Sequence, residues 1–213
     1  MDTRAREQLV AYHRGDLRLT DRAIDRLLGI RPERVERKLR LGDLLKRFGP
    51  ASFDADPTPY ANIRALLHWC SPGPSDVLCD LGAGYGRVVL YGAALSAAGF
   101  RGIELVPERV AATERCRAHL GLSNAELVAA DARVADFGNA NMFFLFNPFS
   151  RPILACVGKR LRQHAARRDL SIASWAESND YFARQEWLTE ITPAEAPPRR
   201  FGLRLFASRR SLV

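Results

Sequence analysis

The sequence has few residues of the kinds that cross-link a chain or hold metals. Its four cysteines (Cys70, Cys79, Cys116 and Cys156) lie far apart, and its four histidines are equally scattered. No cysteine pair has the CxxC spacing typical of zinc or redox sites, so the pattern predicts a reduced protein without a metal. The N-terminus is charged and has a helical pattern rather than that of a signal peptide, which favours a cytoplasmic location.

Long apolar runs are also missing. No stretch of about 18 apolar residues occurs, so we expect no membrane-spanning segment. Internal repeats and low-complexity segments are absent too. A chain of 213 residues with 47% apolar residues suits a single α/β domain with a modest extension.

Acidic residues are fewer than basic ones, and the net charge of +8 is unevenly distributed. Residues 1–50 carry a net charge of +5, residues 51–141 carry −3, and residues 142–213 carry +6. Basic flanks attract nucleic acid or acidic protein surfaces. In the N-terminal segment, however, basic and acidic residues alternate, which favours salt-bridged helix surfaces. Nucleic acid is therefore a possible partner but not the favoured one.

A glycine-rich turn is the most informative motif. The apolar run at 77–81 contains Asp80 and is followed by Gly82, Gly84 and Gly86 at every second position. A helical pattern begins immediately afterwards. A glycine turn between a strand and a helix lets a ligand approach the bare backbone and the first N–H groups of the helix. Asp80 adds a carboxylate at the carboxyl end of the strand, where open α/β sheets bind ligands.

The glycine spacing distinguishes between cofactors. The dinucleotide fingerprint requires glycines at relative positions 1, 3 and 6, whereas here they occupy positions 1, 3 and 5, and Arg87 stands at the sixth. A carboxylate directly before the turn suits a ligand with a cationic group. The pattern Asp-x-Gly-x-Gly-x-Gly resembles motif I of the class I S-adenosylmethionine-dependent methyltransferases. The resemblance implies S-adenosylmethionine as cofactor, bound along the turn that includes Ala83 and Tyr85.

Two further acids follow predicted strands. Glu104 lies 22 residues beyond Gly82, near the position at which an acid binds the ribose of a nucleotide cofactor. Leu105 follows it, and Gly-Ile-Glu-Leu is similar to a segment of the seven-strand protein-lysine methyltransferases. The resemblance also implies that Asp131 binds the adenine amino group and that Ala132 contacts the ring through its backbone. Each acid also fits an ordinary strand end or turn.

The segment Asn147-Pro148-Phe149 follows the fourth predicted strand. It resembles the Asn/Asp-Pro-Pro-Tyr/Phe motif of amino-group methyltransferases but lacks the second proline. We expect catalytic roles for all three residues, with Asn147 also beside the cofactor. An Asn carbonyl accepts amine hydrogens, and an aromatic face stabilises developing positive charge by about 0.5–2 kcal/mol. The alternative is a simple turn, which Asn-Pro initiates well.

Two tyrosines and an arginine complete the candidate set. Tyr85 lies within the turn, and Tyr60 begins the helix before the first strand. Either ring is placed to cover the cofactor, and ordinary packing is the alternative. Arg87 is expected to fix the first helix turn or a carboxylate rather than to react.

Helix and strand patterns alternate along most of the chain. We expect helices over 3–48, a proline-rich linker at 50–59, and a helix over 60–70. Strands are expected at 77–81, 100–105, 126–130, 142–146, 169–175, 185–192 and 201–208, with helices at 87–98, 107–120 and 151–165. The short connections after the third and fifth strands leave room only for short helices or none.

The fold prediction is an α/β, Rossmann-like doubly wound sheet of seven mostly parallel strands with an antiparallel edge strand. Residues 1–58 are expected to form an N-terminal helical extension, acting as a lid or in substrate recognition. Residues 59–213 are expected to form the S-adenosylmethionine-binding methyltransferase domain. The predicted reaction is methylation of a nitrogen on a protein (lysine) or small molecule. An RNA or DNA methyltransferase, an NAD-binding oxidoreductase and a non-catalytic cofactor-binding module remain alternatives.

Overall fold

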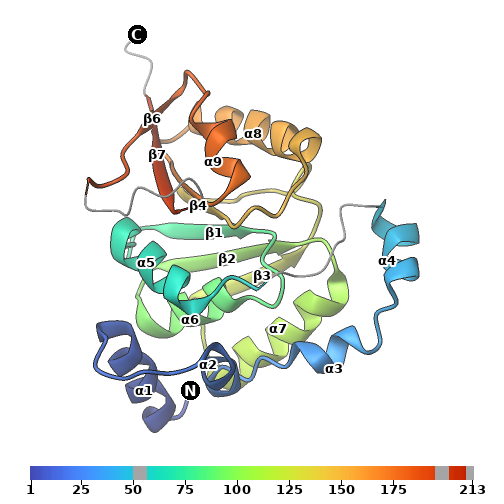
Figure 1. Cartoon of the computed structure of the whole chain (residues 1–213), viewed down its shortest axis with the longest axis vertical. Helices are drawn as coiled ribbons and strands as arrows, with labels where there is room; N and C mark the ends of the chain where they lie inside the picture. The colour runs from blue at the N-terminus through green and yellow to red at the C-terminus, as the bar shows by residue number, and fades with distance from the viewer. Residues whose placement is uncertain (50–56, 195–201, 210–213) are drawn as a thin grey trace.

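A seven-stranded sheet crosses the molecule in the order β3-β2-β1-β4-β5-β7-β6 (Figure 1). The computed structural model describes residues 1–49, 57–194 and 202–209. The strands are β1 (Val77–Leu81), β2 (Gly99–Glu104), β3 (Ala125–Ala129), β4 (Met142–Leu145), β5 (Ser171–Ser174), β6 (Leu188–Glu190) and β7 (Arg204–Ser208). Strands β1 to β5 pair in parallel, whereas β7 pairs antiparallel with both β5 and β6. The predicted fold class is confirmed.

Helices cover both faces of this sheet (Figure 1). They are α1 (Thr3–Arg14), α2 (Asp21–Leu27), α3 (Pro32–Glu36), α4 (Leu41–Phe48), α5 (Tyr60–Cys70), α6 (Arg87–Leu95), α7 (Pro107–Leu120), α8 (Arg151–Ala165) and α9 (Glu177–Phe182). Within the described ranges, no helix combines the length and the apolar character needed to cross a membrane.

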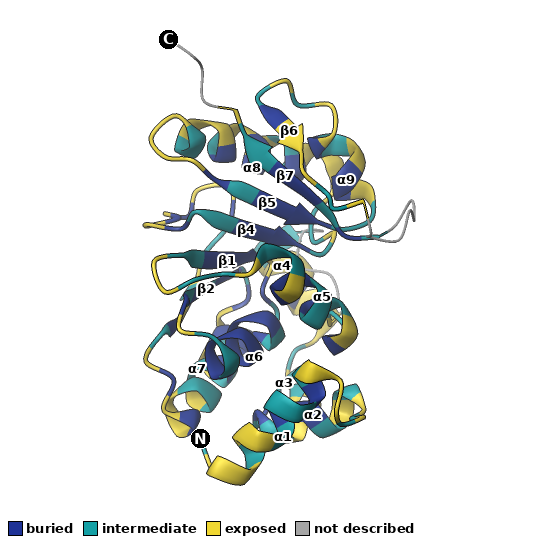
Figure 2. Cartoon of the chain, turned by 90° about the vertical axis from the view of Figure 1, so that its left-hand side faces the viewer, coloured by how far each residue is buried: buried dark blue, intermediate teal, exposed yellow. Residues whose placement is uncertain are grey.

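Alternate residues of the central strands supply two separate cores. Figure 2 shows in dark blue that much of the central strands is buried. Leu78 and Phe144 belong to the core that also contains residues of α1, α2, α5, α6 and α7. Cys79 and Phe143 belong to the opposite core, which includes residues of α8 and α9. Both faces are buried, which explains why these strands are apolar runs without alternation.

The N-terminal helices pack on the same side of the sheet as α6 and α7. Helix α1 contacts α6, and α3 contacts α7. Thr20 caps α2 as expected, since its side-chain oxygen accepts a hydrogen bond from the Ala23 N–H at 3.2 Å. Pro32 stands in the first turn of α3, also as expected. The extension is therefore packed against the helices that flank the glycine turn.

Several elements begin or end at other residues than predicted, and for two of them the structure shows the cause. Helix α6 stops at Leu95, because the Ser96 side chain accepts the Ala98 N–H and donates to the Pro72 carbonyl, competing with further helical hydrogen bonds. Strand β6 is shorter than expected because Gln185 takes part in a turn, in which its carbonyl accepts the Leu188 N–H. The β3–β4 connection contains no helix, as its length predicted. Residues 50–56 of the expected linker lie outside the described part.

Candidate functional site

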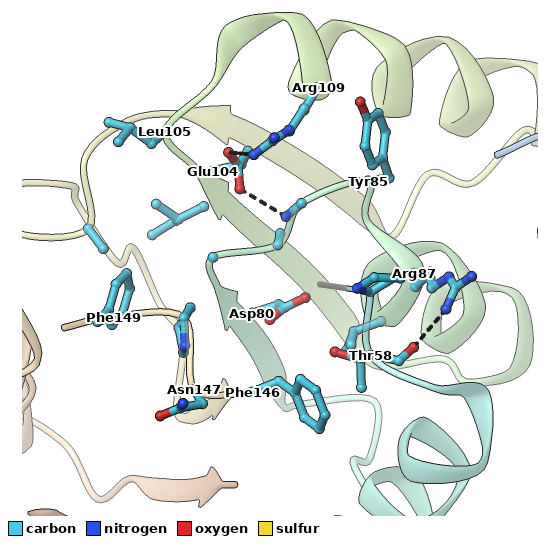
Figure 3. Close-up of a pocket in the computed structure, with 18 of the residues that line it drawn as sticks. Thr58, Asp80, Tyr85, Arg87, Glu104, Leu105, Arg109, Phe146, Asn147 and Phe149 are labelled. Atoms are coloured by element: carbon cyan, nitrogen blue, oxygen red, sulfur yellow. Dashed lines mark hydrogen bonds and ion pairs between the residues drawn. The ribbon is translucent and has the colours of Figure 1, made fainter. Parts of the chain in front are cut away.

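A cavity of about 590 Å³ opens at the carboxyl ends of β1, β2, β3 and β4. The strand order reverses between β1 and β4, and such a switch point is where open α/β sheets bind ligands. The volume lies in the range of cofactor pockets. Figure 3 shows that residues from the ends of separate strands face this common space.

The glycine turn forms the floor of the cavity. All three glycines of the turn have positive φ angles, of 85° at Gly82, 53° at Gly84 and 68° at Gly86. Residues other than glycine rarely adopt such angles. The N–H groups of Gly82 and Ala83 both donate to the Ile103 carbonyl, so the turn is pinned to β2. A Cβ at Gly82 would lie 2.5 Å from the Pro148 Cβ. The turn after β1 therefore packs directly against the turn after β4.

Asp80 lies at the bottom of the cavity and is 5% exposed. Among the described residues, none donates a hydrogen bond to its carboxylate or forms an ion pair with it. Burial, and secondarily the negative charge of Glu104, raise the pKa of Asp80 to about 8. A buried carboxylate without a cationic partner favours a ligand that brings a positive charge.

Glu104 occupies the neighbouring wall and is 6% exposed. Its two carboxylate oxygens accept the N–H groups of Gly84 at 2.9 Å and Val106 at 3.0 Å. Arg109 approaches the same carboxylate to 3.6 Å (Figure 3). The acid is thereby fixed to the glycine turn on one side and to α7 on the other. A carboxylate held in this way retains acceptor sites for a pair of hydroxyl groups.

The far end of the cavity is lined by Leu105, Asp131 and Ala132. The Asp131 carboxylate is bound by Arg133, with Oδ2 and Nη2 2.5 Å apart, and this hydrogen bond lowers the pKa of Asp131. The side chain stays partly exposed at the rim. An ionised acid here can accept a hydrogen bond from an amino group.

The segment after β4 forms the opposite wall. Asn147, Pro148 and Phe149 all line the cavity, and Phe146 precedes them (Figure 3). Asn147 has a φ angle of 50°, an uncommon conformation for a residue other than glycine. Phe146 packs against Trp175, with ring centroids 5.6 Å apart.

Two predicted cofactor residues lie elsewhere, and these expectations are corrected. Tyr60 is fully buried, does not line the cavity, and donates its hydroxyl to Asp25 at 2.8 Å. Gly86 also lies outside the lining, and a Cβ there would meet the Thr113 side chain at 2.3 Å. Tyr60 thus braces the N-terminal extension, and Gly86 permits close packing of the turn on α7.

Arg87 has the structural role expected of it. Its guanidinium bonds the Asp25 carboxylate through Nε at 2.9 Å and Nη2 at 2.6 Å, and reaches Asp21 at 3.2 Å. It also donates to the Thr58 carbonyl, as Figure 3 shows. A largely buried bidentate pair of this kind fixes the first turn of α6 to α2.

The sequence predicted that the N-terminal extension acts as a lid or in substrate recognition, but it did not indicate which of its residues line the cavity. Pro32, Glu36, Pro57 and Thr58 all line it. Glu36 accepts hydrogen bonds from the Tyr85 hydroxyl and from Arg109. Burial and the Glu36 hydrogen bond raise the pKa of Tyr85. No local motif marks these residues, because they meet the site only through tertiary packing.

The raised pKa of Asp80 predicts a pH-dependent stability difference between the wild-type protein and Asp80→Asn. The native state holds this proton up to about pH 8, whereas the unfolded chain releases it near pH 4. Stability from this group therefore falls as pH rises between those values. Asp80→Asn has no buried acid to ionise and does not lose this stability as the pH rises. Its Tm should therefore exceed that of the wild type at pH 9, and the difference in Tm should shrink toward pH 5. Thermal melts across this range test this, and a constant difference would contradict it.

The chain resembles known proteins in its fold. No family model matches the chain, and no curated protein sequence matches it either. Solved structures do match. A candidate methyltransferase from Escherichia coli, yhhF, is 21% identical with a TM-score of 0.60, covering 73% of this chain and 90% of that chain.

Two further structures are similar. An RNA methyltransferase from Salinibacter ruber, crystallised with S-adenosyl-L-homocysteine, is 22% identical with a TM-score of 0.53, covering 71% of this chain and 92% of that one. A TehB-like SAM-dependent methyltransferase from Corynebacterium glutamicum is 14% identical with a TM-score of 0.55, covering 84% and 100%. The chain has the fold of the class I S-adenosylmethionine-dependent methyltransferases.

Proposed function

We propose that the protein is an S-adenosylmethionine-dependent methyltransferase. The observation that carries the proposal is the unpaired, buried Asp80 carboxylate beside a bare glycine turn, with Glu104 and Asp131 farther along the same cavity. This order of groups matches the order of chemistry along the cofactor, which has a cationic amino-acid end, a ribose diol and an adenine amino group. A pyrophosphate would instead be repelled by the acids at Asp80 and Glu104.

In this proposal each residue binds a different part of the cofactor. Asp80, beside the bare glycine turn, holds the amino-acid end, Glu104 accepts the ribose hydroxyls, and Asp131 with Ala132 holds adenine. When bound, the cofactor supplies an activated methyl group. The protein aligns the acceptor with that methyl group and excludes water, which requires no acid–base triad.

We further propose that the acceptor atom is a nitrogen of a protein (lysine) or of a small molecule. Asn147 lies in the wall of the cavity and has a left-handed backbone conformation, with a φ angle of 50°. An amide carbonyl orients the lone pair of an amine by accepting its hydrogens. Phe149, in the same wall, offers an aromatic face to the positive charge that develops on nitrogen. Residues 1–58 act as a lid or recognition element over the domain formed by residues 59–213.

Ligand binding gives the first test. S-adenosylmethionine and S-adenosylhomocysteine should each raise the Tm, since a ligand at 100 times its Kd adds about 2.7 kcal/mol to stability. NAD serves as the control and should leave the Tm unchanged. A thermal-shift assay with all three ligands measures this. A shift with NAD alone, or none with either adenosyl ligand up to millimolar concentration, would overturn the proposal.

Asn147→Ala should retain cofactor binding and lose turnover, because a misaligned nucleophile costs about 100-fold in rate. Methyl-tritiated S-adenosylmethionine is incubated with a bacterial lysate, and label is counted separately in protein, RNA and small molecules. Asn139→Ala is the matched control, since Asn139 is exposed and outside the cavity. Equal labelling by Asn147→Ala and the wild type would show that Asn147 has no role in methyl transfer and that the turn after β4 is only structural.

An RNA or DNA acceptor is the second candidate. The basic flanks favour it, and one structurally similar protein is described as an RNA methyltransferase. If nucleic acid is the acceptor, the logarithm of the binding constant should fall linearly with the logarithm of salt concentration. Fluorescence anisotropy with a labelled RNA at several salt concentrations measures this slope. Label confined to protein or small molecules, together with no RNA binding at low salt, would exclude this acceptor.

A further inference from the structure

The third helix of the N-terminal extension places a carboxylate in the wall of the cavity. Glu36, at the end of α3, accepts the Tyr85 hydroxyl at 2.6 Å and the Arg109 Nε at 3.0 Å on the same oxygen. Tyr85 belongs to the glycine turn and Arg109 to the first turn of α7. A residue distant in sequence thus joins the two segments that surround Glu104.

Arg109 is held between two carboxylates at unequal distances. Arg109 is 3% exposed, and the central carbon of its guanidinium lies 5.9 Å from the centre of the Tyr85 ring. Its Nη1 lies 3.6 Å from Glu104 Oε1, which is beyond hydrogen-bond length, whereas its Nε bonds Glu36. Its Nη2 is buried without a hydrogen-bond partner among the described residues. The guanidinium therefore keeps donor capacity that a small movement would direct to Glu104.

Glu104 has little acceptor capacity to spare. Each of its oxygens already accepts one backbone N–H, from Gly84 or from Val106. A carboxylate has about four acceptor sites, so roughly two remain for a ligand. A bidentate bond from Arg109 would use both. Arg109 and a ribose diol thus compete for the same oxygens.

We propose that Glu36 is a positioning residue for ribose recognition, an inference that rests on the proposed function. By binding Arg109 through Nε, Glu36 holds the guanidinium back from Glu104 and leaves that carboxylate free for the cofactor hydroxyls. The contact also makes the affinity for the cofactor depend on the N-terminal extension, because α3 must be docked for Glu36 to reach Arg109.

The test compares Glu36→Ala with the matched control Glu33→Gln, an exposed acid on the same helix that does not line the cavity. Isothermal titration calorimetry measures the Kd for S-adenosylhomocysteine and for its 2′,3′-dideoxy analogue. Glu36→Ala should weaken S-adenosylhomocysteine binding about tenfold, the value of one hydrogen bond to a charged group. It should not weaken binding of the analogue, which lacks the competing hydroxyls. Glu33→Gln should leave both constants unchanged.

A second variant separates competition from general loosening of the wall. In Glu36→Ala/Arg109→Met the competing guanidinium is gone, so affinity for S-adenosylhomocysteine should recover toward the wild-type value. Equal weakening of both ligands by Glu36→Ala, or no weakening at all, would overturn the proposal. If the double variant does not fold, the comparison of the two ligands decides alone. Absence of S-adenosylhomocysteine binding by the wild type would instead refute the proposed function.

Discussion

Two buried acids at the ends of adjacent parallel strands are the constraint around which this structure is organised. Asp80 and Glu104 are almost inaccessible to solvent. Burial and, secondarily, the charge of Glu104 raise the pKa of Asp80. Burying like charges together costs stability. The fold offsets this for Glu104 with two backbone N–H groups and a nearby guanidinium, whereas Asp80 has no hydrogen-bond or ion-pair partner within residues 1–49, 57–194 and 202–209. This imbalance is the basis for the proposal that the cationic end of the cofactor binds at Asp80.

The N-terminal extension is tied to this site by charge as well as by packing. Asp25 of α2 binds Arg87 at the start of α6, and Glu36 of α3 binds Arg109 at the start of α7. Both arginines follow directly on segments that line the cavity. Displacement of the extension would therefore leave the largely buried Arg87 without its carboxylate partners, a strongly destabilising change, and would free Arg109 to turn toward Glu104. The extension and the cavity wall consequently act as one unit.

Local patterns predicted the sheet well, and the residues that they single out at the strand ends line the cavity, because these features lie in contiguous residues. The apolar run with Asp80, the glycine spacing and the position of Glu104 are sequence features that place groups at strand ends. Tyr60 was assigned wrongly, since nothing in its neighbourhood reveals that its hydroxyl faces Asp25. Glu36 was missed for the same reason. The role of such residues depends on how separate helices dock, and local sequence patterns do not reveal this docking.

The most direct test of the central claim is a crystal structure of the protein with S-adenosylhomocysteine bound. If the protein binds the cofactor as proposed, the amino group of the ligand lies within hydrogen-bonding distance of Asp80 and both ribose hydroxyls contact Glu104. A ligand bound elsewhere, or bound in the reverse direction with adenine against the glycine turn, would contradict it.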